Sequence, residues 1–351
     1  PASELAGGRA ISNLQSPHVV RMKMPREGDT QFHDLIRGDV TFKNDLVDDQ
    51  VLMKSDGFPT YHLANVVDDH LMNITHVIRG EEWLPSTPKH IVLYQMFGWT
   101  PPEFAHLSLL VNEQKQKLSK RHGDVSVEDF KEKGYLPEAL VNFIAFLGWN
   151  PGDTREIFSL QELEKEFSLE NVGSSAAVFH REKLDWYNKQ YIAAMNAEEL
   201  AKRVEPFYQN AGINLLSVVC RLSTVVQLEQ GRAATLADIV EKTGYIFADE
   251  LTYESELLVW KKSTAEDAKK KLEEIEKKLE EMNDSDWGRE LLEKILREWI
   301  AEQGYGVGDV LWPLRVALSG QKNSPGPFEI AEVLGKEKSL DRIRKAIEMM
   351  K

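Results

Sequence analysis

The chain has 351 residues, 42% of them hydrophobic, and a formal net charge of −14 at pH 7, which together fit two or three domains with separate cores. Its one cysteine, Cys220, excludes an intrachain disulfide framework and a cysteine-rich zinc site, and we expect a buried thiol in a reducing compartment. No apolar run approaches the roughly 18 residues of a membrane span, and "PASELAGGRAISN" has no signal-peptide core, so we expect a cytoplasmic protein without a membrane partner.

The first third of the chain predicts strands followed by alternating helices and strands. Residues 17–56 read as short strands, because "HVVRMKMP" alternates and "GDVTF" and "DQVLMKS" are rich in strand-forming residues between turns. "YHLANVVDDHLM" then predicts a helix, and "ITHVIRG" predicts a strand that ends at Gly80. "STPKHIVLYQMFGW" predicts a helix capped by Ser86 that stops near Gly98, and "AHLSLLVN" predicts another strand. This order predicts an α/β unit with a parallel sheet, which binds ligands beyond its strand ends.

Beyond residue 125 the pattern is helical almost throughout. "LPEALVNFIAFLGW" places Pro137 in a first turn, and "FSLQELEKEF" and "HREKLDWYNKQYIAAM" predict further amphipathic helices. In "STAEDAKKKLEEIEKKLEEM" we expect Ser263 and Glu266 to form a capping box. One apolar stripe follows: Ala268, Leu272, Ile275, Leu279 and Met282. It spans only about two heptads, which favours a surface helix of an α-bundle over a coiled coil. "LSGQKNSPGPFEI" predicts a loop before one final helix.

A cluster of cations follows the last predicted strand of the α/β unit. Within "KQKLSKRHGD" these are Lys115, Lys117, Lys120 and Arg121. Such a run is most often a solvated turn, but its place after a strand favours a loop that holds phosphate groups. The sequence contains neither a Walker-type loop nor a dinucleotide-binding glycine motif, so mobile lysine ammonium groups would have to close over the phosphates.

A second candidate site lies in "YHLANVVDDHLMNITHVIRGEEW". Tyr61 and Asn65 are spaced for one face of a helix, Arg79 ends the next strand, and Trp83 follows four residues later. These side chains could converge on a small anionic amino acid, with the arginine as a fork for a carboxylate. Taken singly, the aromatic residues are also explained as core residues, and Arg79 as half of a structural ion pair.

These segments closely resemble glutamyl-tRNA synthetases of the bacterial and organellar type, which are class I aminoacyl-tRNA synthetases. The resemblance rests on "GFPTYHLANVVDDHLMNITHVIRGEEWLPSTPKHIVLYQMFGW" and on "KLSKR", which looks like the family's second signature loop, usually written KMSKS. Leu118 and Arg121 are variants common in the glutamyl branch. The similarity continues through "GYLPEALVNFIAFLGW", "VFHREKLDWYNKQYI" and "PLRVALSG", so it covers nearly the whole chain.

The resemblance implies an α/β plus all-α fold. It consists of the second half of a class I Rossmann catalytic domain, followed by helical stem-contact and anticodon-binding domains. Residues 1–60 would hold the end of a β-rich acceptor-binding insertion, and 61–115 the second Rossmann half. Residues 116–196 would hold the signature loop and the stem-contact helices, and 197–351 the α-helical anticodon-binding domain.

The resemblance also implies roles for single residues. Those matching glutamate-binding positions are Tyr61, Asn65, Arg79 and Trp83. Those of the ATP-binding signature loop are Lys117, Leu118, Ser119, Lys120 and Arg121. Within this loop Lys117 and Lys120 are the catalytic candidates, with Lys120 on the phosphates. The tRNA-binding candidates are Glu82 near the acceptor end, Arg232 as the arginine that separates tRNA-Glu from tRNA-Gln, and Arg315 near the anticodon.

The reaction implied is attack of the glutamate α-carboxylate on the α-phosphate of ATP, followed by transfer of glutamate to the 3′ end of tRNA. ATP and Mg²⁺ would be required, and L-glutamate and tRNA-Glu would be the partners. We expect a monomer with no metal ligands of its own. Catalysis would consist mostly of positioning and electrostatic stabilisation, without a covalent enzyme intermediate.

The family's first signature, a HIGH-type motif, does not occur in these 351 residues. We therefore expect the chain to lack the first Rossmann half and to be inactive alone. Three alternatives stay open: an enzyme that also charges tRNA-Gln, a non-enzymatic tRNA-binding fragment, and a paralogue that glutamylates a tRNA base. Arg232 favours discrimination, the intact "KLSKR" argues against a pure binding protein, and the base-modifying group lacks an anticodon domain.

Overall fold

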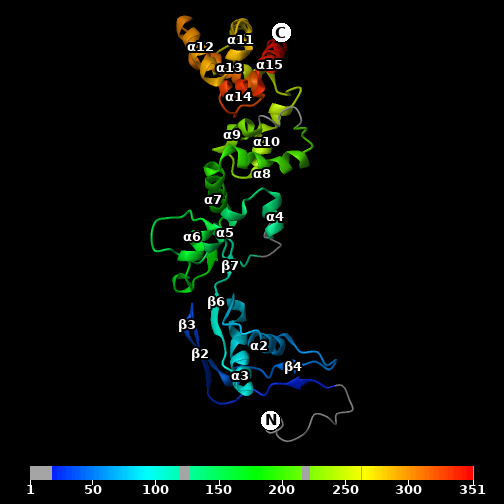
Figure 1. The fold of residues 1–351 in the computed structure, drawn as a ribbon, viewed down its shortest axis with the longest axis vertical. Coiled ribbons are helices and arrows are strands. Elements are labelled where there is room, and N and C mark those ends of the chain that lie inside the picture. The colour runs from blue at the N-terminus through cyan, green and yellow to red at the C-terminus, as the bar shows by residue number, and fades with distance from the viewer. Residues whose placement is uncertain (1–17, 119–125, 216–221, 262, 351) are drawn as a thin grey trace. The chain divides into compact units, whose positions relative to one another are not determined.

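The computed structural model describes residues 18–118, 126–215, 222–261 and 263–350 (Figure 1). These residues form two units. The first contains residues 18–118 and 141–180, and the second contains residues 126–140 together with the described part of 181–350. The domain boundaries predicted from the sequence, after residues 60, 115 and 196, stay a prediction.

The first unit is built on a four-stranded sheet in the order β3-β2-β6-β5. Its strands are β2 (Asp29–Asp34), β3 (Gly38–Lys43), β5 (His76–Gly80) and β6 (Glu103–Leu107). β5 and β6 run parallel, as expected for the α/β unit, and β2 joins them parallel to β6, whereas β3 pairs antiparallel with β2. A tight turn explains the antiparallel pair, because Gly38 takes the left-handed backbone (φ 71°) that closes a hairpin after Asp34.

The segment before the sheet is less regular than its alternating pattern predicts. β1 (Val20–Arg21) has two residues and pairs with β4 (Val51–Met53), and η2 (Asn44–Leu46) lies between the larger strands and β4. Met22 and Met24, which extend the alternation, are buried in a core cluster with residues of the following helices. Their apolar pattern therefore reflects packing in this core.

The predicted order of helix, strand, helix and strand is confirmed as α2 (Tyr61–Leu71), β5, α3 (Thr87–Phe97) and β6. Gly98 ends α3 in the left-handed conformation (φ 71°). Ser86 is the N-cap residue of α3, as expected, but its side chain makes no capping bond, because η3 (Glu81–Ser86) runs straight into the helix. The strand expected for "AHLSLLVN" is broken into β6 and β7 (Leu110–Val111), and β7 pairs with β8 (Ala177–Val178).

The helical region begins as predicted. α5 (Pro137–Ala145) starts at the expected proline, and α6 (Leu160–Glu166) is followed by η5 (Leu169–Asn171). The helices of the second unit are α4 (Val127–Glu132), α7 (Arg181–Ala194), α8 (Ala197–Asn210), α9 (Leu222–Gln230), α10 (Leu236–Phe247), η7 (Ser255–Leu258), α11 (Ala265–Glu280), η8 (Asp284–Asp286), α12 (Arg289–Glu302), α13 (Val307–Ser319), α14 (Pro327–Leu334) and α15 (Lys336–Met349). From α7 to α15 they share one hydrophobic core.

α11 is the surface helix of a bundle, as predicted. Its apolar stripe is buried: Ala268, Leu272, Ile275, Leu279 and Met282. The expected capping box is wrong by one position, because Thr264 is the N-cap and its Oγ1 accepts the Asp267 N–H at 3.1 Å. The single final helix predicted after the loop is instead two helices, because Gly335 (φ 78°) separates α14 from α15.

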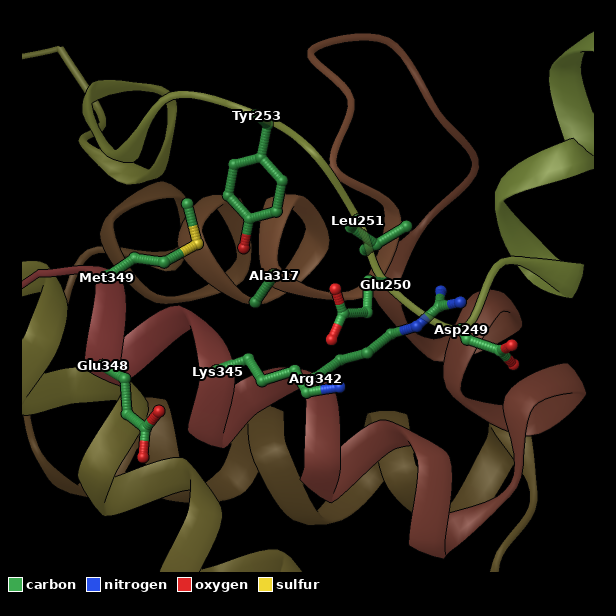
Figure 2. A pocket seen from close by; sticks show the side chains of 9 residues that line it. All are labelled: Asp249, Glu250, Leu251, Tyr253, Ala317, Arg342, Lys345, Glu348 and Met349. Atoms are coloured by element: carbon green, nitrogen blue, oxygen red, sulfur yellow. The ribbon is translucent and has the colours of Figure 1, made fainter.

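Arg342 ties three segments of this unit together beside a cavity of about 430 Å³ (Figure 2). The side chain is 3% exposed, and burial lowers its pKa to about 10. Its Nη1 donates to the Leu318 carbonyl at 2.6 Å. Its Nη2 donates to the carbonyls of Tyr245 and Ala248 at 2.6 and 2.9 Å. These oxygens belong to the ends of α13 and α10, where helix carbonyls lack partners within the helix.

We predict that Arg342→Met lowers the free energy of unfolding by about 3 kcal/mol, because three helix-end carbonyls lose their donor in a buried setting. Arg344→Met is the matched control, two positions along α15. Arg344 is half-exposed and pairs with Glu276 and Glu280, so its loss should cost much less than the loss of Arg342. Urea unfolding followed by circular dichroism measures both, and equal costs would contradict this role for Arg342.

Candidate active site

Three of the four residues predicted to bind an amino acid lie together in the first unit. Tyr61 begins α2, Arg79 lies on β5 and Trp83 lies in η3. The Tyr61 and Trp83 ring centroids are 4.9 Å apart, and the Arg79 guanidinium carbon lies 5.8 Å from the Trp83 ring centroid. The sheet and the two helical segments thus place a cation beside an aromatic pair, close to the carboxyl end of β5.

Asn65 is oriented differently. It follows Tyr61 by one turn of α2, but its Nδ2 donates to Asp69 Oδ2 at 2.9 Å. Burial raises the pKa of Asp69, and the bond from Asn65 opposes that shift. The amide is therefore engaged within its own helix, while Tyr61, Arg79 and Trp83 contact one another.

The guanidinium of Arg79 is held by neutral acceptors. Its Nη2 donates to Thr87 Oγ1 at 2.9 Å and its Nε to His106 Nε2 at 3.1 Å, while Nη1 lies 3.4 Å from His90 Nδ1. Burial lowers the pKa of Arg79, although Tyr61 and nearby carboxylates oppose the shift. Among the residues that the structure describes, no carboxylate lies within ion-pair distance of this side chain. The structural ion pair considered from the sequence is therefore not formed there, and a half-buried positive charge faces the site.

The sequence interpretation missed the residues that hold Arg79. Asp34, Thr87, His90 and His106 are all buried. Burial lowers the pKa of His90 to about 3, and the positive charge of Arg79 adds to that effect, so this imidazole is neutral and can accept a hydrogen bond. The signal that could have revealed these residues is polarity at inward-facing strand positions, such as the histidine that follows Phe104 and Ala105 in "EFAHL".

The described part of the lysine loop starts from β7. The backbone N–H of Leu118 donates to the Leu110 carbonyl at 3.0 Å, which ties the loop to the strand. Lys117 Nζ lies 3.2 Å from Glu82 Oε1, and both side chains are exposed. A bond from its own backbone and the contact with Lys117 lower the pKa of Glu82. The other members of the predicted ATP loop, Ser119, Lys120 and Arg121, lie outside the described residues.

The two predicted anticodon arginines lie in the second unit. Arg232 follows the end of α9, is half-exposed, and donates from Nη1 to Glu229 Oε1 at 3.2 Å. Glu229 is 2% exposed, and burial raises its pKa. Arg315 on α13 lies 4.5 Å from the Trp312 ring centroid and donates to the Lys322 carbonyl at 2.9 Å. Burial and the positive charge of Arg232 lower the pKa of Arg315.

Within the described ranges, no three His, Cys, Asp or Glu side chains are grouped so that they could hold a metal ion. The search of those ranges for a helix long and apolar enough to cross a membrane finds none.

Two family models match the chain in sequence order. The model described as tRNA synthetases class I (E and Q), catalytic domain, matches residues 8–186. The model of an anticodon binding domain matches residues 199–347. The first model covers the whole candidate site around Arg79, and the second covers Arg232 and Arg315.

Similar proteins give the same assignment. A glutamate–tRNA ligase of Thermus thermophilus is 44% identical over 337 residues, which cover 94% of this chain and 69% of that protein. A glutamate–tRNA ligase of Chlorobium phaeovibrioides is 44% identical over 98% of this chain and 68% of its own length. The crystal structure of a glutamate tRNA ligase from Elizabethkingia meningosepticum in complex with its amino acid has a TM-score of 0.85 and 35% identity, over 95% of this chain and 69% of that one. The chain belongs to the class I tRNA synthetases, in the glutamate–tRNA ligase family.

Proposed function

We propose that this chain acts in glutamate–tRNA ligase chemistry, in which ATP activates L-glutamate as glutamyl-adenylate and the glutamyl group passes to the 3′ end of tRNA-Glu. One observation supports this most strongly. Arg79, a half-buried cation without a carboxylate partner among the described residues, lies over the Trp83 ring near the end of a parallel strand, and the Tyr61 ring packs against Trp83. Such a site suits a small anionic substrate.

In this proposal Arg79 takes the side-chain carboxylate of glutamate, because a planar guanidinium offers paired N–H donors to a carboxylate. Tyr61 and Trp83 form the walls, and Asn65 and Tyr61 position the amino-acid head. For Asn65 this requires its amide to exchange Asp69 for the substrate. The α-carboxylate is then free to attack the α-phosphate of ATP.

ATP is proposed to bind the signature loop: Lys117, Leu118, Ser119, Lys120 and Arg121. Lysine ammonium groups would neutralise the charge that grows on the phosphate oxygens, with Lys120 as the main contact and Lys117 beside it. Lys117 would first leave Glu82, and their exposed contact at 3.2 Å costs little to break. Mg²⁺ is proposed to accompany ATP, where it would add positive charge beside the phosphates.

The tRNA is proposed to meet both units of the chain. Glu82 would lie near the acceptor end, and Arg232 and Arg315 would contact the anticodon. A guanidinium is suited to reading a base edge, because its N–H groups lie in one plane. A cytoplasmic location and a monomeric state complete the proposal, and the favoured partner is tRNA-Glu rather than tRNA-Gln.

We expect glutamate- and ATP-dependent charging of tRNA-Glu. The chain is assayed beside an extended chain, in which the amino-terminal segment of a longer glutamate–tRNA ligase relative precedes Pro1. Radiolabelled glutamate on acid-precipitated tRNA gives the rate, and binding of tRNA-Glu by the chain itself gives a second measurement that does not need catalysis. Failure of the extended chain to charge any tRNA, together with equal binding of unrelated tRNAs by the chain, would refute the proposal.

A further inference from the structure

We propose that the buried Asp34–His106 pair is a positioning device that fixes the guanidinium of Arg79 for its carboxylate ligand. The inference rests on the proposed role of Arg79 in binding glutamate and adds two residues to that role. It starts from the order of the strands, since β2, β6 and β5 are neighbours. Asp34 ends β2, His106 lies on β6, and Arg79 on β5 is paired in register with His106.

The contacts form one continuous chain across the sheet. His106 Nδ1 lies 2.5 Å from Asp34 Oδ2, and both side chains are 0% exposed. Arg79 Nε donates to His106 Nε2 at 3.1 Å. The chain therefore runs from a buried carboxylate through an imidazole to the arginine that faces the candidate site.

The proton on His106 is determined by these partners. The bond from His106 and the backbone N–H groups keep the pKa of Asp34 below its ordinary value despite burial, so the carboxylate is ionised and only accepts hydrogen bonds. His106 Nδ1 must then carry the hydrogen. Burial lowers the pKa of His106, so the ring is neutral and Nε2 presents a lone pair to Arg79.

This lone pair orients the guanidinium. Nε is held by His106, and Nη2 is held by Thr87 Oγ1 at 2.9 Å. With two nitrogens fixed, the plane of the group cannot rotate about the end of its long side chain. The N–H groups that a carboxylate accepts as a fork are then those of the two terminal nitrogens that point away from Thr87 and His90, one of which a ligand would take over from Tyr61. Asp34 acts on the ligand through His106 and Arg79, without touching it.

Asp34→Asn tests which ring nitrogen of His106 carries the hydrogen, and it leaves the volume of the side chain almost unchanged. Asp34 Oδ1 accepts the backbone N–H groups of Ile36 and Arg37 at 3.1 and 3.0 Å, so the amide oxygen of asparagine must stay there. The amide nitrogen then faces His106 Nδ1 and donates to it. The hydrogen of the imidazole moves to Nε2, where it opposes the N–H of Arg79 Nε.

We expect two results from this variant. ¹⁵N-detected histidine spectra of the chain should show His106 with its hydrogen on Nδ1 in the wild type and on Nε2 in Asp34→Asn. In the extended chain the KM for glutamate should rise by about 10-fold or more, which corresponds to loss of one hydrogen bond to a charged group, while the KM for ATP stays within about twofold. Urea unfolding of both proteins shows whether the fold is kept.

Asp39→Asn is the matched control. Asp39 also pairs with a histidine of the same sheet, since His33 Nδ1 lies 2.8 Å from Asp39 Oδ1, but both side chains are exposed and neither contacts Arg79.

His106→Gln is a second variant. Its amide oxygen can accept from Arg79 although the bond to Asp34 is lost, so its KM for glutamate should lie closer to that of the wild type than the KM of Asp34→Asn.

If Asp34 and His106 acted only in folding, His106→Gln would raise the KM for glutamate more than Asp34→Asn, because it loses the buried contact that Asp34→Asn keeps. A larger KM for glutamate in His106→Gln than in Asp34→Asn would overturn the inference. So would an unchanged KM for glutamate in a folded Asp34→Asn protein whose His106 hydrogen has moved. An extended wild-type chain that charges no tRNA would instead refute the proposed function. The histidine spectra separate the two failures, because they need no substrate.

Discussion

Arg79→Met in the extended chain is expected to lower kcat/KM for glutamate by about 10²- to 10³-fold, with most of the loss in KM. The reason is that a half-buried guanidinium would lose a charge-assisted, two-point contact with the substrate carboxylate. The preference for glutamate over glutamine should fall as well, because methionine no longer distinguishes a carboxylate from an amide. Charging rates over a series of glutamate and glutamine concentrations measure both quantities.

Two further variants separate charge from geometry. Arg79→Lys keeps the positive charge but cannot donate to His106, Thr87 and a ligand at once, so we expect it to recover only part of the loss. Arg155→Met is the control in the same unit, because Arg155 is exposed and pairs with Asp153 and Glu166. A loss that appears in the KM for ATP and not for glutamate would contradict the assignment of Arg79.

The elements around this site could be predicted from the sequence because their signals are local. The 3.6-residue pattern of α2, the β-branched run of β5 and the glycine after α3 each depend on a few neighbouring residues. Arg79 and Trp83 are close in sequence, at the end of β5 and in η3, and Tyr61 joins them from the start of α2. The stripe on α11 was predictable for the same reason.

What the sequence did not reveal is non-local. Asp34 and His106 are separated by 72 positions, and no pattern within either segment indicates their contact. Each occupies an inward-facing strand position where an apolar residue is expected, so each weakens the strand signal that it belongs to. Ser86 shows a smaller difference. It occupies the predicted N-cap position, but η3 already supplies helical backbone before α3, so its side chain makes no capping bond.

The resemblance provided roles for single residues, and the structure adds their surroundings. Arg232 illustrates the difference. Its position could be matched to a motif, whereas its contact with the buried Glu229 follows from the end of α9 and the way that helix packs in its unit. A carboxylate that is 2% exposed cannot move far, so it limits the directions in which the guanidinium can point.

Arg232→Gln is expected to reduce the preference for tRNA-Glu over tRNA-Gln by about 10-fold or more, because a bidentate base contact discriminates by about 1–3 kcal/mol. The dissociation constants of the chain for the two tRNAs at one fixed salt concentration give this ratio, and competitive charging by the extended chain gives it independently. Affinity for tRNA-Gln should change less than affinity for tRNA-Glu.

Arg297→Gln is the matched control, because Arg297 is exposed to a similar extent in the same unit and also pairs with a glutamate a few positions before it. Arg232→Lys separates two explanations. If Arg232 contacts only a phosphate, lysine preserves binding and the glutamine variant weakens both tRNAs equally. If it reads a base, lysine loses discrimination although the charge is kept. Equal binding of both tRNAs by the wild-type chain would refute the assignment of Arg232 and favour an enzyme that charges tRNA-Gln as well.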